Sequence, residues 1–171
     1  MKYFNGFSLA NENRLFTEYL SNGSRTVVGF SYGAQKAFEY AYSTPNFVDR
    51  LILLSPAFFQ MEKQSFVRTQ LRYFESDHKA YIDTFLQNVA YPSSFDLSEY
   101  KQTGTKEDLE ALLTYVWDTD KIDDLKSRGT TIEVFLGMKD KIINAENAET
   151  FFTQCTTTYS IKNVGHILRE A

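Results

Sequence analysis

Gly29-Phe30-Ser31-Tyr32-Gly33 is the stretch of sequence that decides the fold. It ends a β-rich run over residues 26–30 and leads into a helical pattern over residues 33–43. A serine flanked by glycines at a strand-to-helix junction is typical of a nucleophile elbow, a sharp turn that exposes the hydroxyl. The glycines allow that strained turn to close. We therefore predict Ser31 as a nucleophile, with an ordinary strand–helix turn as the alternative.

A nucleophilic serine needs a base at neutral pH, and the chain has two histidines. His78 lies between charged residues at the start of a predicted helix, which favours a solvated surface position. His166 follows the last predicted strand, over residues 157–164. A loop at the carboxyl end of a strand can reach the elbow, so we expect His166 to be the base. The alternative is a surface histidine near the end of the chain.

The base in turn needs a carboxylate that orients it. Asp140 lies just past the predicted strand 131–137, and it completes the order Ser…Asp…His that this type of elbow accompanies. Asp118 and Asp120 are the competitors, but they fall in a helical region where solvation or helix capping explains them. We expect Asp140 to be the acid because of its position.

Two backbone N–H groups should stabilise the oxyanion that forms during acyl transfer. The residue after the nucleophile, Tyr32, supplies one of them. The second should come from the loop after the first predicted strand, which is residues 5–8. Within this loop we predict the N–H of Phe7.

Strand and helix patterns alternate along the chain. We expect strands at 2–4, 26–30, 49–55, 131–137 and 157–164, and helices at 10–21, 33–43 and 145–154. Residues 61–127 contain helical patterns, best at 61–75, 77–89 and 105–117, and no convincing strand. This indicates an α/β fold with about five mostly parallel strands. A helical cap, 61–127, is inserted between the third and fourth strands of a core formed by 1–60 and 128–171, within a single domain.

Composition narrows the function classes for this chain of 171 residues. The net charge of −4 does not favour a nucleic-acid partner. One cysteine, Cys155, excludes an internal disulfide, and we interpret it as structural. Two histidines and this cysteine do not have the spacing of a metal site, and no phosphate-binding loop is present, so no metal or cofactor is expected. Without a signal-peptide pattern or an apolar run of membrane length, we expect a cytoplasmic protein.

Five segments, in order, resemble motifs of the α/β-hydrolases. FNGFS (4–8) resembles the oxyanion loop, with Asn5 where histidine is usual, and GFSYG (29–33) resembles the elbow. LILLSPAFF (51–59), FLGMKDKII (135–143) and NVGHILRE (163–170) resemble the next strand, the acid motif and the histidine loop. The chain also looks like the pimeloyl-(acyl-carrier protein) methyl ester esterases of biotin synthesis, above all the short BioV type. The opening KYFNGF and the segments FVRTQLRYF (66–74) and YIDTFLQNV (81–89) carry that narrower resemblance.

The narrower resemblance implies hydrolysis of the methyl ester of pimeloyl-(acyl-carrier protein) methyl ester, with the acyl-carrier protein as partner. Arg68 and Arg72 share one helix face, so they could bind the acidic carrier and its phosphate, or form a solvated face. Phe66 and Tyr73 are candidate acyl-channel residues, together with Phe74, Tyr81 and Phe85, although helical spacing alone also produces packing residues. A general carboxylesterase or acyl thioesterase, and a catalytically silent binding protein, remain alternatives.

The short N-terminal part creates a topological question. Between the oxyanion loop and Ser31 there is room for one helix and one strand, so the fold is expected to be trimmed. Right-handed crossovers that progress one way across a sheet put their helices on one face. We expect the other face to be covered by the return segment of the cap, the C-terminal tail or a second subunit.

Overall fold

A computed structural model describes residues 1–20 and 23–171, and one sheet forms the centre of this part of the chain. Its strands are β1 (Lys2–Phe4), β2 (Thr26–Phe30), β3 (Arg50–Leu54), β4 (Thr131–Gly137) and β5 (Thr157–Ile161). They lie side by side in chain order, and every neighbouring pair is parallel. The predicted class, a trimmed fold with about five mostly parallel strands, is confirmed.

Burial follows the position of each strand in the sheet. All five residues of β2 are buried, as are the last four of β3, whereas the edge strand β5 is largely exposed. A parallel strand covered on both faces must be apolar on both faces, which explains the continuous run LILL (51–54). The carboxyl ends of these strands meet at one edge of the sheet, where the functional loops begin.

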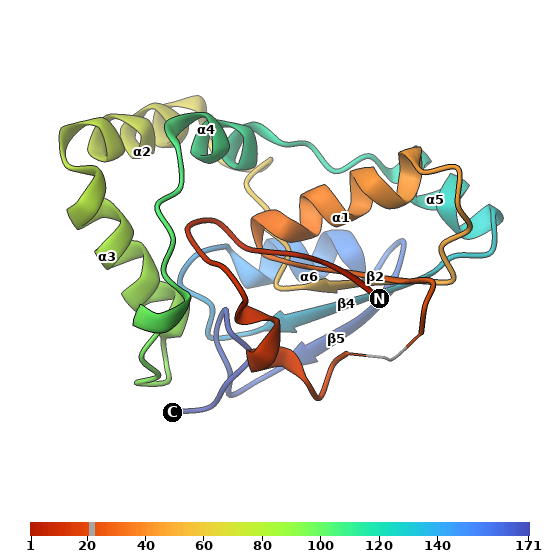
Figure 1. The fold of residues 1–171 in the computed structure, drawn as a ribbon. Coiled ribbons are helices and arrows are strands. Elements are labelled where there is room, and N and C mark those ends of the chain that lie inside the picture. The colour runs from red at the N-terminus through yellow and green to blue at the C-terminus, as the bar shows by residue number, and fades with distance from the viewer. Residues whose placement is uncertain (21–22) are drawn as a thin grey trace.

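Two helices cover one face of the sheet (Figure 1). α1 (Tyr32–Ser43) packs on β1, β2 and β3, and α6 (Ala145–Phe152) packs on β4 and β5. The buried residues Ala34, Ala37, Phe38 and Ala41 recur at helical spacing and form the apolar face of α1. The small size of the three alanines allows α1 to lie close to the strands.

The helical insertion between β3 and β4 is also confirmed. It consists of α2 (Gln64–Ser76), α3 (His78–Ala90), the 3-10 helix η2 (Ser98–Tyr100), α4 (Lys106–Thr114) and α5 (Thr119–Ser127). Figure 1 shows α2, α3 and α4 beyond one end of the sheet, whereas α5 lies beside α1 at the other end. The helix predicted over 105–117 stops at Thr114. A separate helix, α5, begins after Asp118, whose side chain accepts the N–H groups of Asp120 and Lys121.

The helix predicted over residues 10–21 is wrong in its described part. A 3-10 helix, η1 (Glu12–Phe16), is the helical element there, and residues 21 and 22 lie outside the described residues. Asn11 adopts a left-handed conformation (φ 60°), and the side chain of Glu12 binds the N–H of Gly6. The left-handed conformation of Asn11 interrupts a regular helix at this point.

The second face of the sheet is covered from two directions. The N-terminal crossover, which is the segment that joins β1 to β2 and contains η1, packs Phe16 on Phe30, with ring centroids 4.7 Å apart. It also packs Tyr19 on Phe135, with ring centroids 5.0 Å apart. The C-terminal segment adds His166, 5.0 Å from the Phe30 ring. The expected cover by the C-terminal tail is thus present, but the N-terminal crossover was not foreseen. On the same face Tyr159, the central residue of β5, stays 44% exposed.

Candidate active site

Ser31 lies between β2 and α1 in a strained turn. Its backbone angles are φ 54° and ψ −117°, a combination that costs a non-glycine residue roughly 1–3 kcal/mol. The surrounding backbone holds this conformation: the Ser31 N–H donates to the carbonyl of Leu54 at 2.9 Å, and the Ser31 carbonyl accepts from Ala34 and Ala57. Strain maintained in this way is a feature of functional sites.

Both glycines of the elbow are required by close backbone approach. A Cβ on Gly29 would lie 2.1 Å from the carbonyl oxygen of Gly33, and one on Gly33 would lie 2.0 Å from that of Phe4. The first contact closes the turn, and the second brings the end of β1 against the start of α1. The spacing G-x-S-x-G is therefore a steric requirement of this turn.

Ser31, His166 and Asp140 form a continuous chain of hydrogen bonds. His166 Nε2 lies 2.8 Å from Ser31 Oγ, and His166 Nδ1 lies 2.6 Å from Asp140 Oδ2. The Ser31 residue is 3% exposed and His166 is fully buried. Three residues separated widely in sequence thus meet at the carboxyl ends of β2, β4 and β5.

The loop after β4 fixes the Asp140 carboxylate in one orientation. Asp140 Oδ1 accepts the N–H groups of Ile142 at 2.6 Å and Ile143 at 3.2 Å, so Oδ2 is left for His166. The orientation matches the role of a group that holds a histidine ring in one tautomer.

The loop that carries His166 is fitted tightly between the core and the cap. A Cβ on Gly165 would lie 1.8 Å from the carbonyl oxygen of Tyr91, at the end of α3. On the core side, a Cβ on Gly137 would lie 2.1 Å from the carbonyl oxygen of Gly165. The histidine loop is therefore positioned by backbone contacts on both sides.

The predicted oxyanion donors lie in two adjacent segments. Neither the N–H of Tyr32 nor that of Phe7 has an acceptor among the described residues. The Phe7 ring packs against the cap, 5.5 Å from the ring of Phe85. Tyr32 also donates its hydroxyl to Asp108 at 3.2 Å, and burial, reinforced by this carboxylate, raises the pKa of Tyr32 to about 12.

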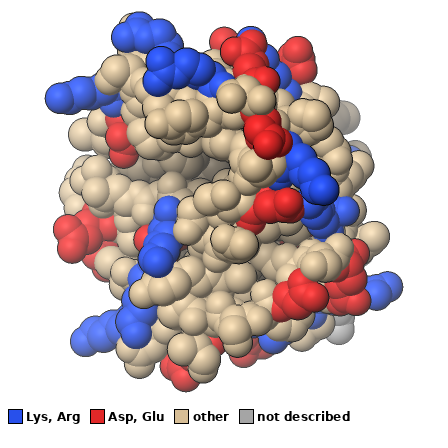
Figure 2. All heavy atoms as spheres, turned by 90° about the vertical axis from the view of Figure 1, so that its left-hand side faces the viewer, with Lys and Arg blue, Asp and Glu red and all other residues tan. Residues whose placement is uncertain are grey.

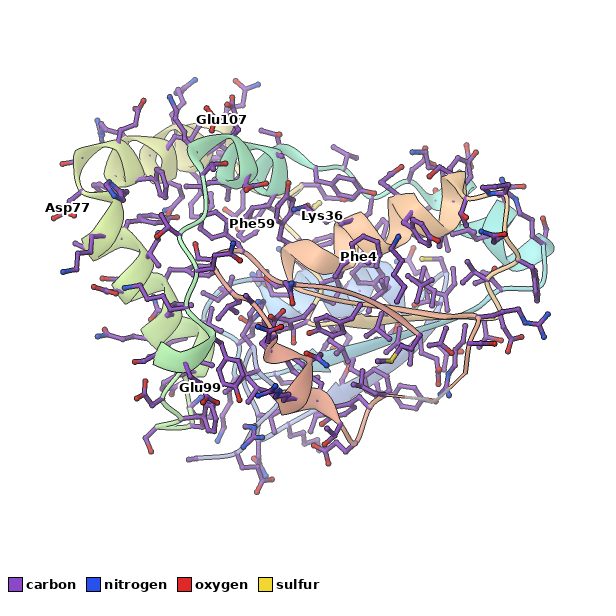
Figure 3. All side chains as sticks on the ribbon, viewed as in Figure 1. Phe4, Lys36, Phe59, Asp77, Glu99 and Glu107 are labelled. Carbon is purple, nitrogen blue, oxygen red and sulfur yellow. The ribbon has the colours of Figure 1, made fainter. Side chains whose placement is uncertain are left out.

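A cavity of about 480 Å³ lies between the cap and the core, a size typical of ligand pockets. Ile142, two residues after Asp140, and Phe85, which packs on Phe7, belong to its wall, whereas Ser31, Asp140 and His166 are not among the residues that line it. Figure 2 shows the surface hollowed on this side, and Figure 3 places Phe59 beneath α4 and Asp77 at the α2–α3 turn. The lining residues come from α2, α3, α4 and the core loops: Phe59, Phe66, Gln70, Tyr73, Asp77, Ala80, Tyr81, Thr84, Phe85, Asn88, Leu109, Leu112, Leu113, Lys141 and Ile142.

Most of the cap aromatics predicted from the sequence reach this cavity. Phe66, Tyr73, Tyr81 and Phe85 line it, and Tyr73 is 55% exposed. Phe74 instead is buried in the core, where its ring contacts Phe7 and Tyr81.

The predicted basic residues of α2 are on the surface. Arg68 and Arg72 are exposed, and neither forms an ion pair with any residue that the structure describes. Figure 2 shows Lys and Arg side chains gathered at one upper corner of the cap face.

The remaining candidates stay away from this constellation. His78 is exposed at the first turn of α3, and Asp118 caps α5. Cys155 is buried, and burial raises its pKa. Residues 1–20 and 23–171 contain no group of three or more His, Cys, Asp or Glu that could hold a metal ion, and no helix there is long and apolar enough to cross a membrane.

Two buried polar residues near the site were missed by sequence reasoning. Gln35 Nε2 donates to the carbonyls of Ala57 and Leu112, and so ties α1 to the loop after β3 and to the cap. Glu12 binds the loop that follows β1. A polar residue at a helical core position was the available signal for Gln35. Nothing local distinguished Glu12 from a solvated carboxylate.

The sequence profile of the α/β hydrolase fold matches residues 4–129, which is most of the chain. The chain belongs to this family. The matched range includes the last residue of β1, the elbow, β3 and the whole helical insertion, while Asp140 and His166 lie beyond it. No curated protein sequence matches the chain.

Solved α/β-hydrolase structures share the fold at low sequence identity. An esterase from Exiguobacterium antarcticum is 16% identical with a TM-score of 0.66, and the alignment covers 90% of this chain and 63% of the esterase. MenH from S. aureus is 11% identical with a TM-score of 0.63, covering 96% and 85%. Naproxen esterase, a carboxylesterase from Bacillus subtilis, is 19% identical with a TM-score of 0.54, covering 84% and 53%. The chain thus spans less than two thirds of the length of both esterases.

Proposed function

We propose that this protein is a serine carboxylic ester hydrolase with Ser31 as nucleophile. The observation that carries the proposal is the unbroken chain from Asp140 through His166 to a serine in a strained elbow. His166 accepts the Ser31 proton through Nε2 as Oγ attacks the ester carbonyl. Asp140 keeps the other ring proton on Nδ1 and stabilises the imidazolium that forms.

The negative oxygen of the tetrahedral intermediate accepts hydrogen bonds from the N–H groups of Tyr32 and Phe7. Tyr32 begins α1, so the positive end of that helix adds a favourable field. His166 then gives its proton to the leaving alcohol, and a water molecule, activated by the same histidine, hydrolyses the acyl-enzyme. Ser31 and His166 return to their starting protonation.

For the substrate, we propose the methyl ester of pimeloyl-(acyl-carrier protein) methyl ester, which yields pimeloyl-(acyl-carrier protein) and methanol. The cavity supports this choice because its inner wall is apolar, with Phe59, Leu109 and Leu113, as an alkyl chain requires. Polar residues Gln70 and Asn88 also line it and could bind the amides of a phosphopantetheine arm. The resemblance of the motifs to the BioV type supports the same substrate.

Arg68 and Arg72 are the proposed contacts for the acyl-carrier protein. Both project from α2, and Phe66, Gln70 and Tyr73 of the same helix line the cavity. A carrier docked on α2 would therefore sit at the cavity wall. Exposed arginines without an ion-pair partner in the described part of the chain are available for an acidic surface and a phosphate.

The reaction is tested with purified pimeloyl-(acyl-carrier protein) methyl ester and mass spectrometry of the carrier. Wild-type protein should remove the methyl group, and Ser31→Ala should lower the rate by about 10⁶-fold, the scale found when a triad nucleophile is deleted. Rapid hydrolysis of varied free esters without action on the carrier-linked ester would favour a general carboxylesterase or acyl thioesterase. Failure of Ser31 to react with a fluorophosphonate probe would favour a catalytically silent protein.

The docking surface is tested by a charge-reversal pair and a matched control. Arg68→Glu/Arg72→Glu should raise KM for the carrier-linked ester and leave p-nitrophenyl acetate hydrolysis unchanged. The control, Arg25→Glu/Lys126→Glu, changes the net charge equally, but these residues precede the amino ends of β2 and β4, opposite the site. Equal losses on both substrates, or equal effects of both pairs on KM, would contradict docking on α2.

A further inference from the structure

Glu12 is a fully buried carboxylic residue beside the loop after β1, and the proposed reaction leaves it without a role. It is 0% exposed, although glutamate is almost never fully buried unless it is paired. Glu12 Oε1 accepts the N–H of Gly6 at 2.7 Å and the hydroxyl of Tyr3 at 3.3 Å. Burial raises the pKa of Glu12, and the bonds from Gly6 and Tyr3 partly oppose this.

The bond from Gly6 constrains the loop that should supply the second oxyanion donor. The Gly6 N–H is occupied by Glu12, so it is not free for a substrate oxygen. The Gly6 carbonyl accepts the Leu9 N–H at 3.3 Å. In a trans peptide the N–H points opposite to the carbonyl, so the Phe7 N–H is directed away from Leu9. The peptides on both sides of Gly6 are thus fixed, and the Phe7 N–H is left without an acceptor in the described part of the chain.

The same loop is in contact with the elbow. The carbonyl oxygens of Phe4 and Asn5 would lie within 2.6 Å of a Cβ on Gly33, and a Cβ on Gly6 would lie 2.8 Å from the ring of Phe30. A shift of the Gly6 backbone therefore changes where the Phe7 N–H lies relative to Ser31. Misplacement by 1 Å in such a site can cost about 10²-fold in rate.

Glu12 is also the polar side chain that anchors this loop to the crossover. Asn5 is exposed, and its side chain forms no hydrogen bond with the described residues. Ser8 and Asn11 have positive φ values of 58° and 60° on the path between Gly6 and Glu12. Such conformations persist where surrounding interactions hold them, and the Glu12–Gly6 bond closes this segment into a loop.

We propose that Glu12 is a positioning residue that holds the Gly6–Phe7 segment so that the Phe7 N–H binds the oxyanion. This inference rests on the proposed ester hydrolysis at Ser31. Glu12 touches neither the substrate nor the reacting atoms; it acts through the backbone of Gly6.

The test compares wild type with Glu12→Ala, Glu12→Asp and Glu12→Gln on p-nitrophenyl butyrate. Alanine removes the acceptor, and aspartate is one methylene too short to reach Gly6. Both variants should lower kcat by roughly 10- to 100-fold with KM nearly unchanged, because the lost interaction exists in the transition state. Glutamine keeps an acceptor oxygen of the same reach and should retain kcat within about threefold.

A second readout separates positioning from stability. A trifluoromethyl ketone adds to Ser31 and forms an oxyanion, so its affinity should fall in Glu12→Asp by the same factor as kcat. The affinity for butyrate, the product acid, should stay unchanged. Leu15→Ala, which truncates another buried residue of η1, is the structural control: it should lower the unfolding temperature and keep kcat.

The outcomes separate a failure of the proposed role of Glu12 from a failure of the proposed ester hydrolysis. Full kcat in Glu12→Asp, or parallel losses of kcat in Leu15→Ala and Glu12→Asp, would overturn the role of Glu12 and leave the ester hydrolysis intact. If Glu12→Ala does not fold, the aspartate and glutamine variants still give this comparison. A wild-type protein without Ser31-dependent hydrolysis would overturn the proposed function and, with it, this inference.

Discussion

Replacing Asp140 by asparagine should trap the base in the wrong tautomer. The Oδ1 side of Asp140 faces the N–H groups of Ile142 and Ile143, so an amide NH₂ cannot be placed there without opposing two donors. The amide oxygen must occupy that side, and the NH₂ must face His166 Nδ1. That nitrogen then becomes an acceptor, and the ring proton moves to Nε2, which lies 2.8 Å from Ser31 Oγ. A protonated Nε2 cannot accept the serine proton.

The loss should be about 10⁴-fold in kcat, the size seen when a triad aspartate becomes asparagine, which corresponds to ~5.4 kcal/mol of activation free energy. Release of p-nitrophenolate measures kcat, and ¹⁵N NMR of the His166 ring identifies the protonated nitrogen. Asp118→Asn is the matched control. It makes the same change at the N-cap of α5, where asparagine caps equally well, so activity should stay unchanged. A loss below tenfold in Asp140→Asn, or a ring proton still on Nδ1, would refute the reasoning.

Three further predictions concern the scaffold. Gly33→Ala should lower the free energy of unfolding, measured in urea, by more than about 3 kcal/mol, because the added Cβ would lie 2.0 Å from the backbone oxygen of Phe4. A loss below about 1 kcal/mol would contradict the steric argument. Phe16→Ala, which empties a fully buried position against the Phe30 ring, should cost about 3–5 kcal/mol in the same assay, and a near-neutral result would mean that the crossover does not hold the second face. Because burial raises the pKa of Glu12 above 4.5, its contribution to stability is present below that pH and is lost as the pH rises through the folded-state pKa. The stability of wild type relative to Glu12→Gln should therefore fall from pH 4.5 towards neutral, and a constant difference in urea unfolding would argue against the shift.

The positions of the candidate triad residues follow from the sequence because strand ends carry them. Ser31 comes directly after β2, Asp140 soon after β4 and His166 soon after β5, and parallel strands bring these ends to one edge. Its place just past the strand predicted at 131–137 then favoured Asp140 over Asp118, which caps a helix in the structure. Strand ends are visible in a sequence because apolar runs and glycines mark them.

The features that depend on long-range burial could not be predicted. The pattern over 10–21 had apolar residues at helical spacing, but Phe16 and Tyr19 satisfy that pattern by covering the sheet from a 3-10 helix and a turn. Glu12 looks like a surface carboxylate until Gly6 and Tyr3 are placed against it. Competition between a side-chain bond and a helix is decided by such tertiary contacts, which composition and periodicity do not contain.

The contact between Gly165 and the carbonyl of Tyr91 also limits how this enzyme scaffold could be recombined. An inserted helical segment can be regarded as a unit that evolution or an engineer exchanges to change substrate preference. Here the end of α3 presses on the backbone next to His166, at a place where no side chain fits. A foreign segment would have to place its own backbone at the same position, or leave the loop that carries His166 without this contact. Replacing the whole stretch from α2 to α4 by a foreign segment should therefore disturb the protein more than single substitutions of the residues that line the cavity.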